Sequence, residues 1–397
     1  MMRDFWRQAL NIFKESMRSL FRGRVPLAAL LIGTPLVFTL IFGGIYLYNV
    51  VNDIPLVVYD ECQSKLSREV VNAYEDSDRF AFVSEVGSEE EMRGELLSGR
   101  ALAALEVPKK FSEDVLAGRG GTALLLVNSA NNMFGNAAVA ASTEIARSLS
   151  VAAGAQVLEA GGLLPGAALV STYPVRLGVR ILGNPTNGYG PFMLAGLMLN
   201  GLQIGLMAAF APFFVGELLA PRFGRARAGA IALAGAAPYV LVSFLGYLLS
   251  LGVITALFAV PIRGSLLAVA GLGLSFLVFV AGVLLLFSAC VPSCELALQA
   301  PMLYIMPGVL YSGLSWPTFD MNGFAAAFGA LLPMTYVADA LRDVMLMGYA
   351  PALRENIAIM LLAGLGTGAA AACVFSWRRG GGLGRLARRL ARKKAAA

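Results

Sequence analysis

Residues that could support bond-making chemistry are scarce in this chain, and their spacing does not form a catalytic site. The chain has no histidine, which removes the usual general base. Cys290 and Cys294 form a Cys-x-x-x-Cys pair, but the sequence offers no His or nearby third Cys to complete a metal site, and Cys62 and Cys373 stand alone. The Ser, Asp and Glu residues of the stretch 49–180 lack a base for a nucleophilic triad. We therefore expect no catalytic residue, no metal site and no bound cofactor on this chain.

A phosphate-binding loop is also missing from the sequence. No Gly-x-x-x-x-Gly-Lys-Ser/Thr segment occurs, so the chain does not bind ATP by that route. Any ATP-driven step must receive its energy from another polypeptide.

Six long apolar stretches are the elements that would position any functional residues of the chain. Each is free of charged side chains and reaches the roughly 20 residues that a helix needs to cross a bilayer core. They are Val25–Tyr48, Ile181–Gly216, Ala228–Ile262, Gly264–Cys294, Leu296–Phe319 and Asn356–Trp377. With 57% apolar and 14% charged residues, the chain is predicted to be an α-helical polytopic membrane protein with six transmembrane helices.

The charges are sorted along the chain. Residues 49–190 hold 11 Lys/Arg against 17 Asp/Glu, whereas the rest of the chain holds 20 against 8. Basic residues gather before the first span, between the second and third spans (Arg222, Arg225 and Arg227) and after the sixth. Because short basic loops stay in the cytoplasm, both termini are predicted to be cytoplasmic, and the acidic block to lie outside a bacterial inner membrane. The sorting gives no argument for nucleic-acid binding.

Residues 1–24 are predicted to form a cytoplasmic amphipathic helix that lies in the membrane interface. Trp6, Leu10, Phe13, Met17 and Leu20 recur at helical spacing, and basic residues lie off that stripe. The alternative, a cleaved signal peptide, is disfavoured by the long charged region and the missing small-residue cleavage site.

Residues 49–180 are predicted to form an inserted small α/β extracytoplasmic domain. Strand-like segments at 54–59, 79–86, 101–107 and 122–127 alternate with helix-like ones, and Ser88 with Glu91 forms a capping box. This alternation predicts a partly parallel sheet. Its acidic residues are interpreted as a solvated face, with binding of a substrate or periplasmic partner as the alternative.

The remaining boundaries follow from the same pattern. Residues 25–48 are the first transmembrane helix, and 181–377 form a five-helix transmembrane region. The uncharged segment Met321–Ala338 is too short to cross and return, so it predicts a re-entrant outer hairpin near 320–340. A surface-lying amphipathic segment is the alternative. Residues 378–397 are a basic cytoplasmic tail, predicted to lie on anionic membrane lipid.

Several short blocks together resemble one family. They are Ile54–Asp60 with Ser64–Arg68, Leu105–Phe111 with Gly118-Arg119, Asn184-Pro185-Thr186, Val260–Ser265, Ser312–Pro317, Leu332–Tyr336 and Ala340–Arg342. In order and spacing they resemble the ABC type-2 permeases, the membrane subunits of ATP-driven exporters. The loop between the second and third spans departs from the family pattern, because Glu217 is retained whereas 218–237 is basic and rich in small residues.

The resemblance implies a permease subunit that forms the path for a substrate, driven by a cytoplasmic ABC ATPase subunit that carries ATP and Mg²⁺. It also implies a second permease, either another copy or a homologue; periplasmic export components are a further class of partner. Ionisable residues are nearly absent from the spans, which favours a hydrophobic or amphipathic substrate over protons or ions. A non-transport scaffold or sensor, whose outer domain binds a ligand or partner, is the alternative.

Two sets of residues are candidates for the working parts of such a permease. The surface that contacts the ATPase is predicted to include Trp6, Phe13, Glu217 and Arg222. The outer re-entrant hairpin is predicted to involve Trp316, Pro317, Pro333 and Tyr336.

Overall fold

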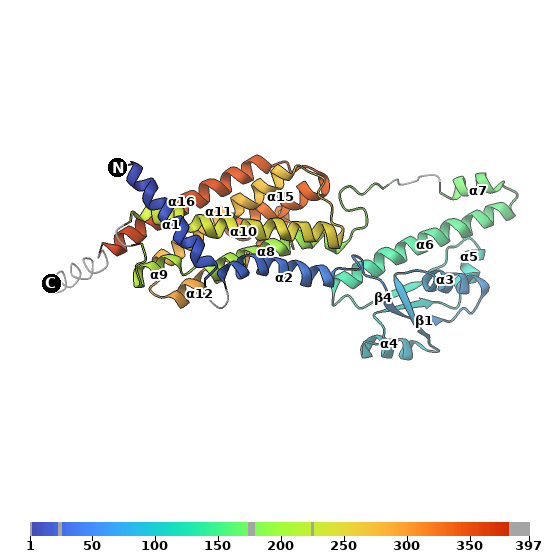
Figure 1. The fold of residues 1–397 in the computed structure, drawn as a ribbon. Helices are drawn as coiled ribbons and strands as arrows, with labels where there is room; N and C mark the ends of the chain where they lie inside the picture. Colours follow the sequence, from blue (N-terminus) through green and yellow to red (C-terminus); the bar gives the residue numbers. More distant parts are fainter. Residues whose placement is uncertain (1, 23–25, 174–178, 224–225, 381–397) are drawn as a thin grey trace. The chain divides into compact units, whose positions relative to one another are not determined.

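The chain divides into two compact units, one inserted into the other. The computed structural model describes residues 2–22, 26–173, 179–223 and 226–380. Val50–Arg180 forms one unit, and Met1–Asn49 together with Ile181–Ala397 forms the other (Figure 1). Arg24, Arg225 and the basic tail beyond Gly380, which carried part of the charge argument, lie outside the described residues.

Apolar helices build the larger unit. Five of them are long and apolar enough to cross a membrane, or six if a bent pair of helices counts as one span. The five are α2 (Leu27–Ile45), α8 with α9 (Tyr189–Phe210 and Phe213–Leu219), α10 (Ala228–Phe258), α11 (Leu266–Cys290) and α16 (Leu353–Arg379). They make the chain a multi-pass membrane protein.

The fifth predicted span, 296–319, does not form one long helix, so that expectation is wrong in its simple form. The region holds α12 (Cys294–Ile305), α13 (Gly308–Tyr311) and a short 3-10 turn, η1 (Thr318–Asp320). At 12 residues, α12 is about 18 Å long, too short to span alone. Pro307 explains the break, because it lacks the N–H that would continue the helix and its ring clashes with the preceding turn.

The segment after η1 turns sharply instead of running straight. Helices α14 (Gly323–Gly329) and α15 (Pro333–Met347) meet at 86°, as expected for a broken span or a re-entrant loop. Proline at the first position of α15 starts that helix without losing a hydrogen bond, since the first turn has no partner for its N–H.

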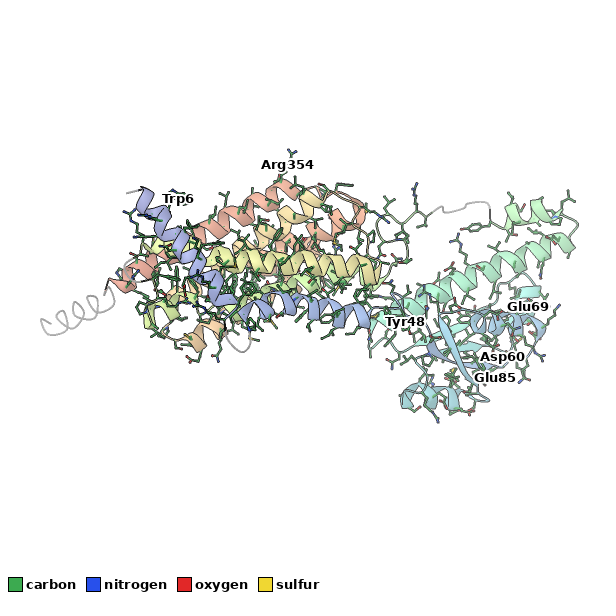
Figure 2. All side chains as sticks on the ribbon, in the orientation of Figure 1. Trp6, Tyr48, Asp60, Glu69, Glu85 and Arg354 are labelled. Carbon is green, nitrogen blue, oxygen red and sulfur yellow. The ribbon has the colours of Figure 1, made fainter. Side chains whose placement is uncertain are left out.

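Helix α1 (Met2–Leu20) is amphipathic, but the face that packs on the bundle is rotated relative to the predicted stripe. Ile12, Ser16 and Leu20 are buried, and Phe13 packs against the same core. Trp6, at one edge of the predicted stripe, is 67% exposed (Figure 2). The packed stripe therefore lies about one residue away from the one that hydrophobic spacing alone selects.

The smaller unit is built on a four-stranded sheet in the order β2-β1-β3-β4. Strands β1 (Ile54–Asp60), β2 (Phe80–Glu85) and β3 (Ala103–Val107) are parallel, and β4 (Leu124–Val127) is antiparallel to β3. The helices between and after them are α3 (Lys65–Glu75), α4 (Glu89–Ser98), α5 (Phe111–Leu116), α6 (Asn132–Ala160) and α7 (Pro165–Thr172). The sheet is partly parallel, as the alternation of strands and helices predicts.

The central strand β1 is covered on both faces, which explains why it reads as a continuous apolar run. Leu56 and Val58 pack with Val70 of α3 and Ala138 of α6, whereas Val57 packs with Met92 of α4. The predicted cap of α4 is present: Ser88 Oγ accepts from Glu91 N at 3.2 Å. The Glu91 carboxylate accepts from Gly87 N at 3.0 Å, one residue before the expected donor.

Helices α11 and α16 approach each other closely through glycine. A Cβ added at Gly364 would lie 2.7 Å from the backbone of Val278, and one at Gly282 would meet the Gly364 carbonyl. In contrast, a Cβ at Gly366 or Gly368 would meet nothing within 4 Å. The first two glycines therefore set the distance between the helices, and the other two do not.

We expect Gly364→Ala to lower the stability of the larger unit by about 1–3 kcal/mol, because the helices must separate to admit the methyl group. Gly366→Ala is the matched control, and it should change stability by less than about 1 kcal/mol. Thermal unfolding of both variants in the same detergent measures the difference. Equal unfolding temperatures would show that α11 and α16 do not pack this closely.

Candidate functional site

Glu217 and Arg222, the two polar residues singled out in the loop after the second span, lie together in the structure. The helix α8 ends before Pro212, and the short helix α9 carries Glu217 on its buried side. The Phe214 and Val215 amides at the start of α9 donate to Ser288 Oγ of α11, at 3.0 and 3.1 Å. One hydroxyl thus satisfies two amides freed by the helix break and fixes α9 against α11.

The Glu217 carboxylate is buried, whereas the Arg222 guanidinium is accessible. Their side chains are 1% and 43% exposed, with Arg222 Nε 3.6 Å from Glu217 Oε2. Glu217 Oε1 accepts from Phe223 N at 2.8 Å. Arg222 also lies over the rings of Phe213 and Phe223, at 5.8 and 5.2 Å. Glu217 therefore anchors the loop through the Phe223 amide, and Arg222 is the more exposed member of the pair.

Two arginines at the end of α16, Arg378 and Arg379, join the same region, although the sequence predicted them to begin the basic tail that lies on the lipid. Arg378 Nη1 donates to the carbonyls of Ala289 and Val291, at 2.5 and 2.7 Å. Arg379 Nη1 donates to the Ala226 carbonyl at 2.9 Å. Arg378 thus caps the C-terminal end of α11, where a cation is favoured, and Arg379 ties the loop to α16. Figure 1 shows α9, the start of α12 and the end of α16 at one end of the bundle.

The two aromatic candidates on α1 have different surroundings. Trp6 is exposed and meets Phe5 edge-on, with ring centroids 5.7 Å apart. Phe13 packs against the bundle core. Of the two, Trp6 therefore presents the more open surface to a partner.

Two of the four predicted outer-hairpin residues, Pro333 and Tyr336, lie at the bend between α14 and α15. Pro333 is buried at the start of α15, and Tyr336 Oη donates to the Ala330 carbonyl at 2.7 Å. Thr335 Oγ1 donates to the Gly329 carbonyl at 2.7 Å, and Tyr304 Oη donates to Leu331 O. Each hydroxyl satisfies a carbonyl that the bend frees. Trp316 and Pro317 lie exposed in the turn before η1 and do not join these contacts.

Buried polar residues inside the bundle were missed by the sequence analysis. Gln203 Nε2 of α8 donates to Asn200 Oδ1 at 2.8 Å and contacts the Ile305 carbonyl at 3.5 Å. That carbonyl ends α12, next to the break at Pro307. An Asn and a Gln three residues apart in an apolar span are the signal that could have revealed this contact.

The smaller unit has a cavity of its own, about 720 Å³ in volume. Its walls come from α3, α5, α6, strands β3 and β4 and the segment before β4, and they include Val70, Phe111, Leu125 and Leu149. Glu69 is the one carboxylate among the lining residues. A cavity of this size is within the range of small-molecule sites.

These features define a multi-pass membrane protein with a structured loop at one end of its helix bundle and a separate α/β unit. The sequence matches the ABC-2 family transporter proteins over residues 27–373. The chain therefore belongs to the ABC-2 transporter family, which confirms the resemblance drawn from its motifs. No curated protein compared with the chain matches it.

Membership settles the general role of the chain. It is a permease component of an ABC transporter, a membrane transport subunit and not itself an enzyme. The family also implies an ATPase partner.

Replacing Glu217 should loosen the loop that carries Arg222. In Glu217→Leu the Phe223 amide loses its buried acceptor, which costs about 1–3 kcal/mol of local stability. We expect trypsin to cut after Arg222 at least about fivefold faster, because cleavage follows local opening. Glu295→Gln, which removes a carboxylate at the start of α12, is the control. An unchanged cleavage rate in Glu217→Leu would contradict the anchoring role.

Proposed function

We propose that the chain is the permease subunit of an exporter that moves a hydrophobic or amphipathic molecule outward across a bacterial inner membrane. The observation that carries the proposal is the structured loop after α9. It presents Arg222 to a partner, while Ser288 holds α9 to α11 and Arg379 holds the loop to α16. A force that the ATPase exerts on this loop would therefore act directly on two spans, α11 and α16. Trp6 on α1 offers a second contact.

The chemistry of the spans supports an apolar cargo. Helices α2, α8, α10 and α11 contain no Asp, Glu, Lys or Arg. A carrier of protons or small ions needs an ionisable or coordinating group in its path. Apolar and aromatic surfaces suit a molecule that already partitions into the membrane, and the cavity of the smaller unit offers such a molecule a place on the outer side.

The membrane topology follows from the basic residues. Arg222, Arg227, Arg378 and Arg379 all belong to one end of the bundle, which supports a cytoplasmic location for that end and for both termini. An even number of crossings then needs a sixth span, for which the bent pair α14–α15 is the candidate. Residues 50–180 would lie outside, where periplasmic export components are accessible.

The main test is transport by the reconstituted complex. The permease, co-expressed with its ATPase subunit and placed in vesicles, should drive ATP-dependent movement of a lipophilic dye. Arg222→Ala should reduce this transport at least about tenfold, because the loop loses its charge-assisted contact, worth about 1.5–3 kcal/mol. Arg354→Ala, at the opposite end of α16, should transport normally. If Arg222→Ala transports as the parent does, this loop does not couple the two subunits.

Cys62 provides the topology test, and its reactivity can be anticipated. Burial acts to raise the pKa of the Cys62 thiol, but hydrogen bonds with Ser112, whose Oγ is 3.2 Å from Sγ, and with Ser64 stabilise the thiolate, so its pKa is lowered from its ordinary value. A lower pKa leaves more thiolate at neutral pH, which is the reactive form.

A membrane-impermeant maleimide should therefore label Cys62 from the outside of intact cells. Ser112→Ala removes one stabilising hydrogen bond and should shift the rate–pH curve of labelling to higher pH. Labelling of Cys62 from the cytoplasmic side alone would reverse the proposed orientation. An unchanged curve in Ser112→Ala would show that Ser112 does not stabilise the thiolate.

A further inference from the structure

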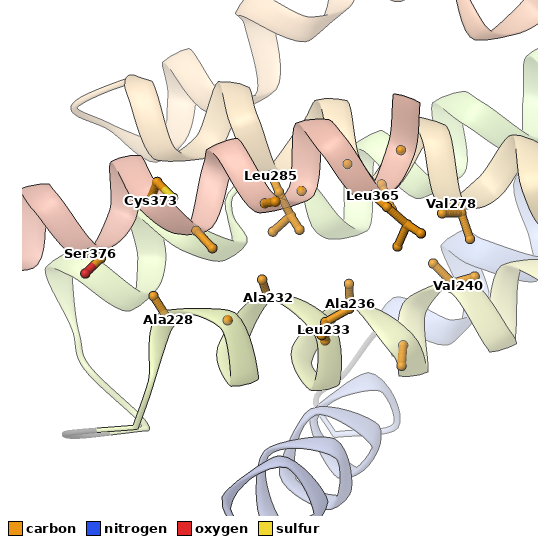
Figure 3. Close-up of a pocket in the computed structure, with 18 of the residues that line it drawn as sticks. Ala228, Ala232, Leu233, Ala236, Val240, Val278, Leu285, Leu365, Cys373 and Ser376 are labelled. Carbon is orange, nitrogen blue, oxygen red and sulfur yellow. The ribbon is translucent and has the colours of Figure 1, made fainter. Parts of the chain in front are cut away.

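A wide apolar groove runs along the larger unit between α10 on one side and α11 with α16 on the other (Figure 3). Its volume is about 1020 Å³. The lining is apolar and rich in small residues, among them Ala232, Ala236 and Gly368. Leu233 and Leu365, which also line it, are 61% and 54% exposed, so the groove is open to the surroundings of the bundle.

Two glycines that line the groove lie at tight helix contacts, and two others lie in open space. Gly364 and Gly282 bring α11 and α16 together, with no room for a side chain at either position. Gly229 on α10 and Gly368 on α16 have nothing within 4 Å of an added Cβ. The absence of side chains at these two positions therefore leaves space that no other part of the described chain fills.

The groove is long enough to extend through one membrane leaflet. It extends from Gly364 to Trp377 on α16 and from Ala228 to Leu241 on α10. Thirteen residues of helix rise about 20 Å, and half of a bilayer core is about 15 Å thick. A lipid acyl chain anchored at one surface would fill such a groove along its length.

One end of the groove is strongly basic. Arg227 directly precedes the lining residues Ala228 and Gly229, and Arg378 and Arg379 directly follow Trp377. Arg379 donates to the Ala226 carbonyl, so the arginines at the end of α16 lie close to Arg227 at the start of α10. None of these arginines pairs with a carboxylate within the described part of the chain. Trp377 beside them is the type of residue that lies at the headgroup level.

We propose that this groove binds an anionic phospholipid, with an acyl chain between α10 and α16 and its phosphate at Arg227 and Arg379. A second copy of the chain is a poorer occupant. Two copies in one membrane have the same orientation, so a two-fold contact through this face would bring three arginines of each copy together. An anionic headgroup neutralises these charges, and a zwitterionic one does so less well.

Fluorescence quenching tests the proposal directly, because Trp377 lines the groove and the chain has two other tryptophans. In the variant Trp6→Phe/Trp316→Phe, emission comes from Trp377 alone. The protein is reconstituted in phosphatidylcholine that contains a small fraction of brominated phosphatidylglycerol or brominated phosphatidylcholine. We expect an apparent affinity for the anionic lipid at least about fivefold higher, which a single lipid-facing cation can supply.

Two substitutions in this background separate the parts of the site. Gly368→Leu fills open space, so the protein should fold normally and lose the preference for the anionic lipid. Arg227→Gln should reduce the preference, whereas Arg354→Gln, an exposed arginine at the other end of α16 (Figure 2), should leave it unchanged.

Three results would overturn the proposal. The first is equal quenching by the two brominated lipids. The second is a preference that survives in Gly368→Leu, which would place the lipid outside the groove. The third is efficient oxidative cross-linking of two chains through Cys373, the groove cysteine, when the other cysteines are replaced by serine. That result would show a second copy on this face.

Discussion

The larger unit depends on one constraint: where an apolar helix breaks, the backbone groups that it frees must find partners without water. At the end of α8 the partner is Ser288, which accepts from two amides of α9. At the α14–α15 bend, Thr335 and Tyr336 donate to carbonyls of the preceding turn. An unsatisfied peptide group in hydrocarbon costs several kcal/mol, so these side chains decide where the bundle can bend.

The same constraint explains how the loop after α9 is held. Glu217 is a buried carboxylate whose partners are a backbone amide and Arg222. Arg222 is more exposed and lies over two phenylalanine rings. Because α9 is held to α11 and the Ala226 carbonyl to α16, the proposed force on Arg222 would act close to contacts with both spans.

Apolar length and alternating patterns in the sequence predicted most elements of the fold, including the long helices and the four strands. They did not predict the break at Pro307, because a charge-free run of sufficient length looks the same whether or not its helix is continuous. The packed face of α1 was also missed by about one residue, since spacing shows that a stripe exists but not which edge the neighbouring helix covers. Arg378 and Arg379 were assigned to the basic tail, because their acceptors are carbonyls distant in the sequence, which no local pattern records.

Glycine shows why composition alone says little about such a bundle. Gly364 and Gly368 lie one turn apart on α16 and form a Gly-x-x-x-Gly spacing that is usually interpreted as a contact between helices. Only Gly364 makes that contact, because Val278 of α11 lies against it. Gly368 faces an open groove, where the missing side chain leaves room for something else. The position of α10 decides between the two roles, since it diverges from the α11–α16 pair and leaves one side of α16 uncovered. Tight and open packing therefore come from the same residue type, and the arrangement of the third helix determines which one a given glycine provides.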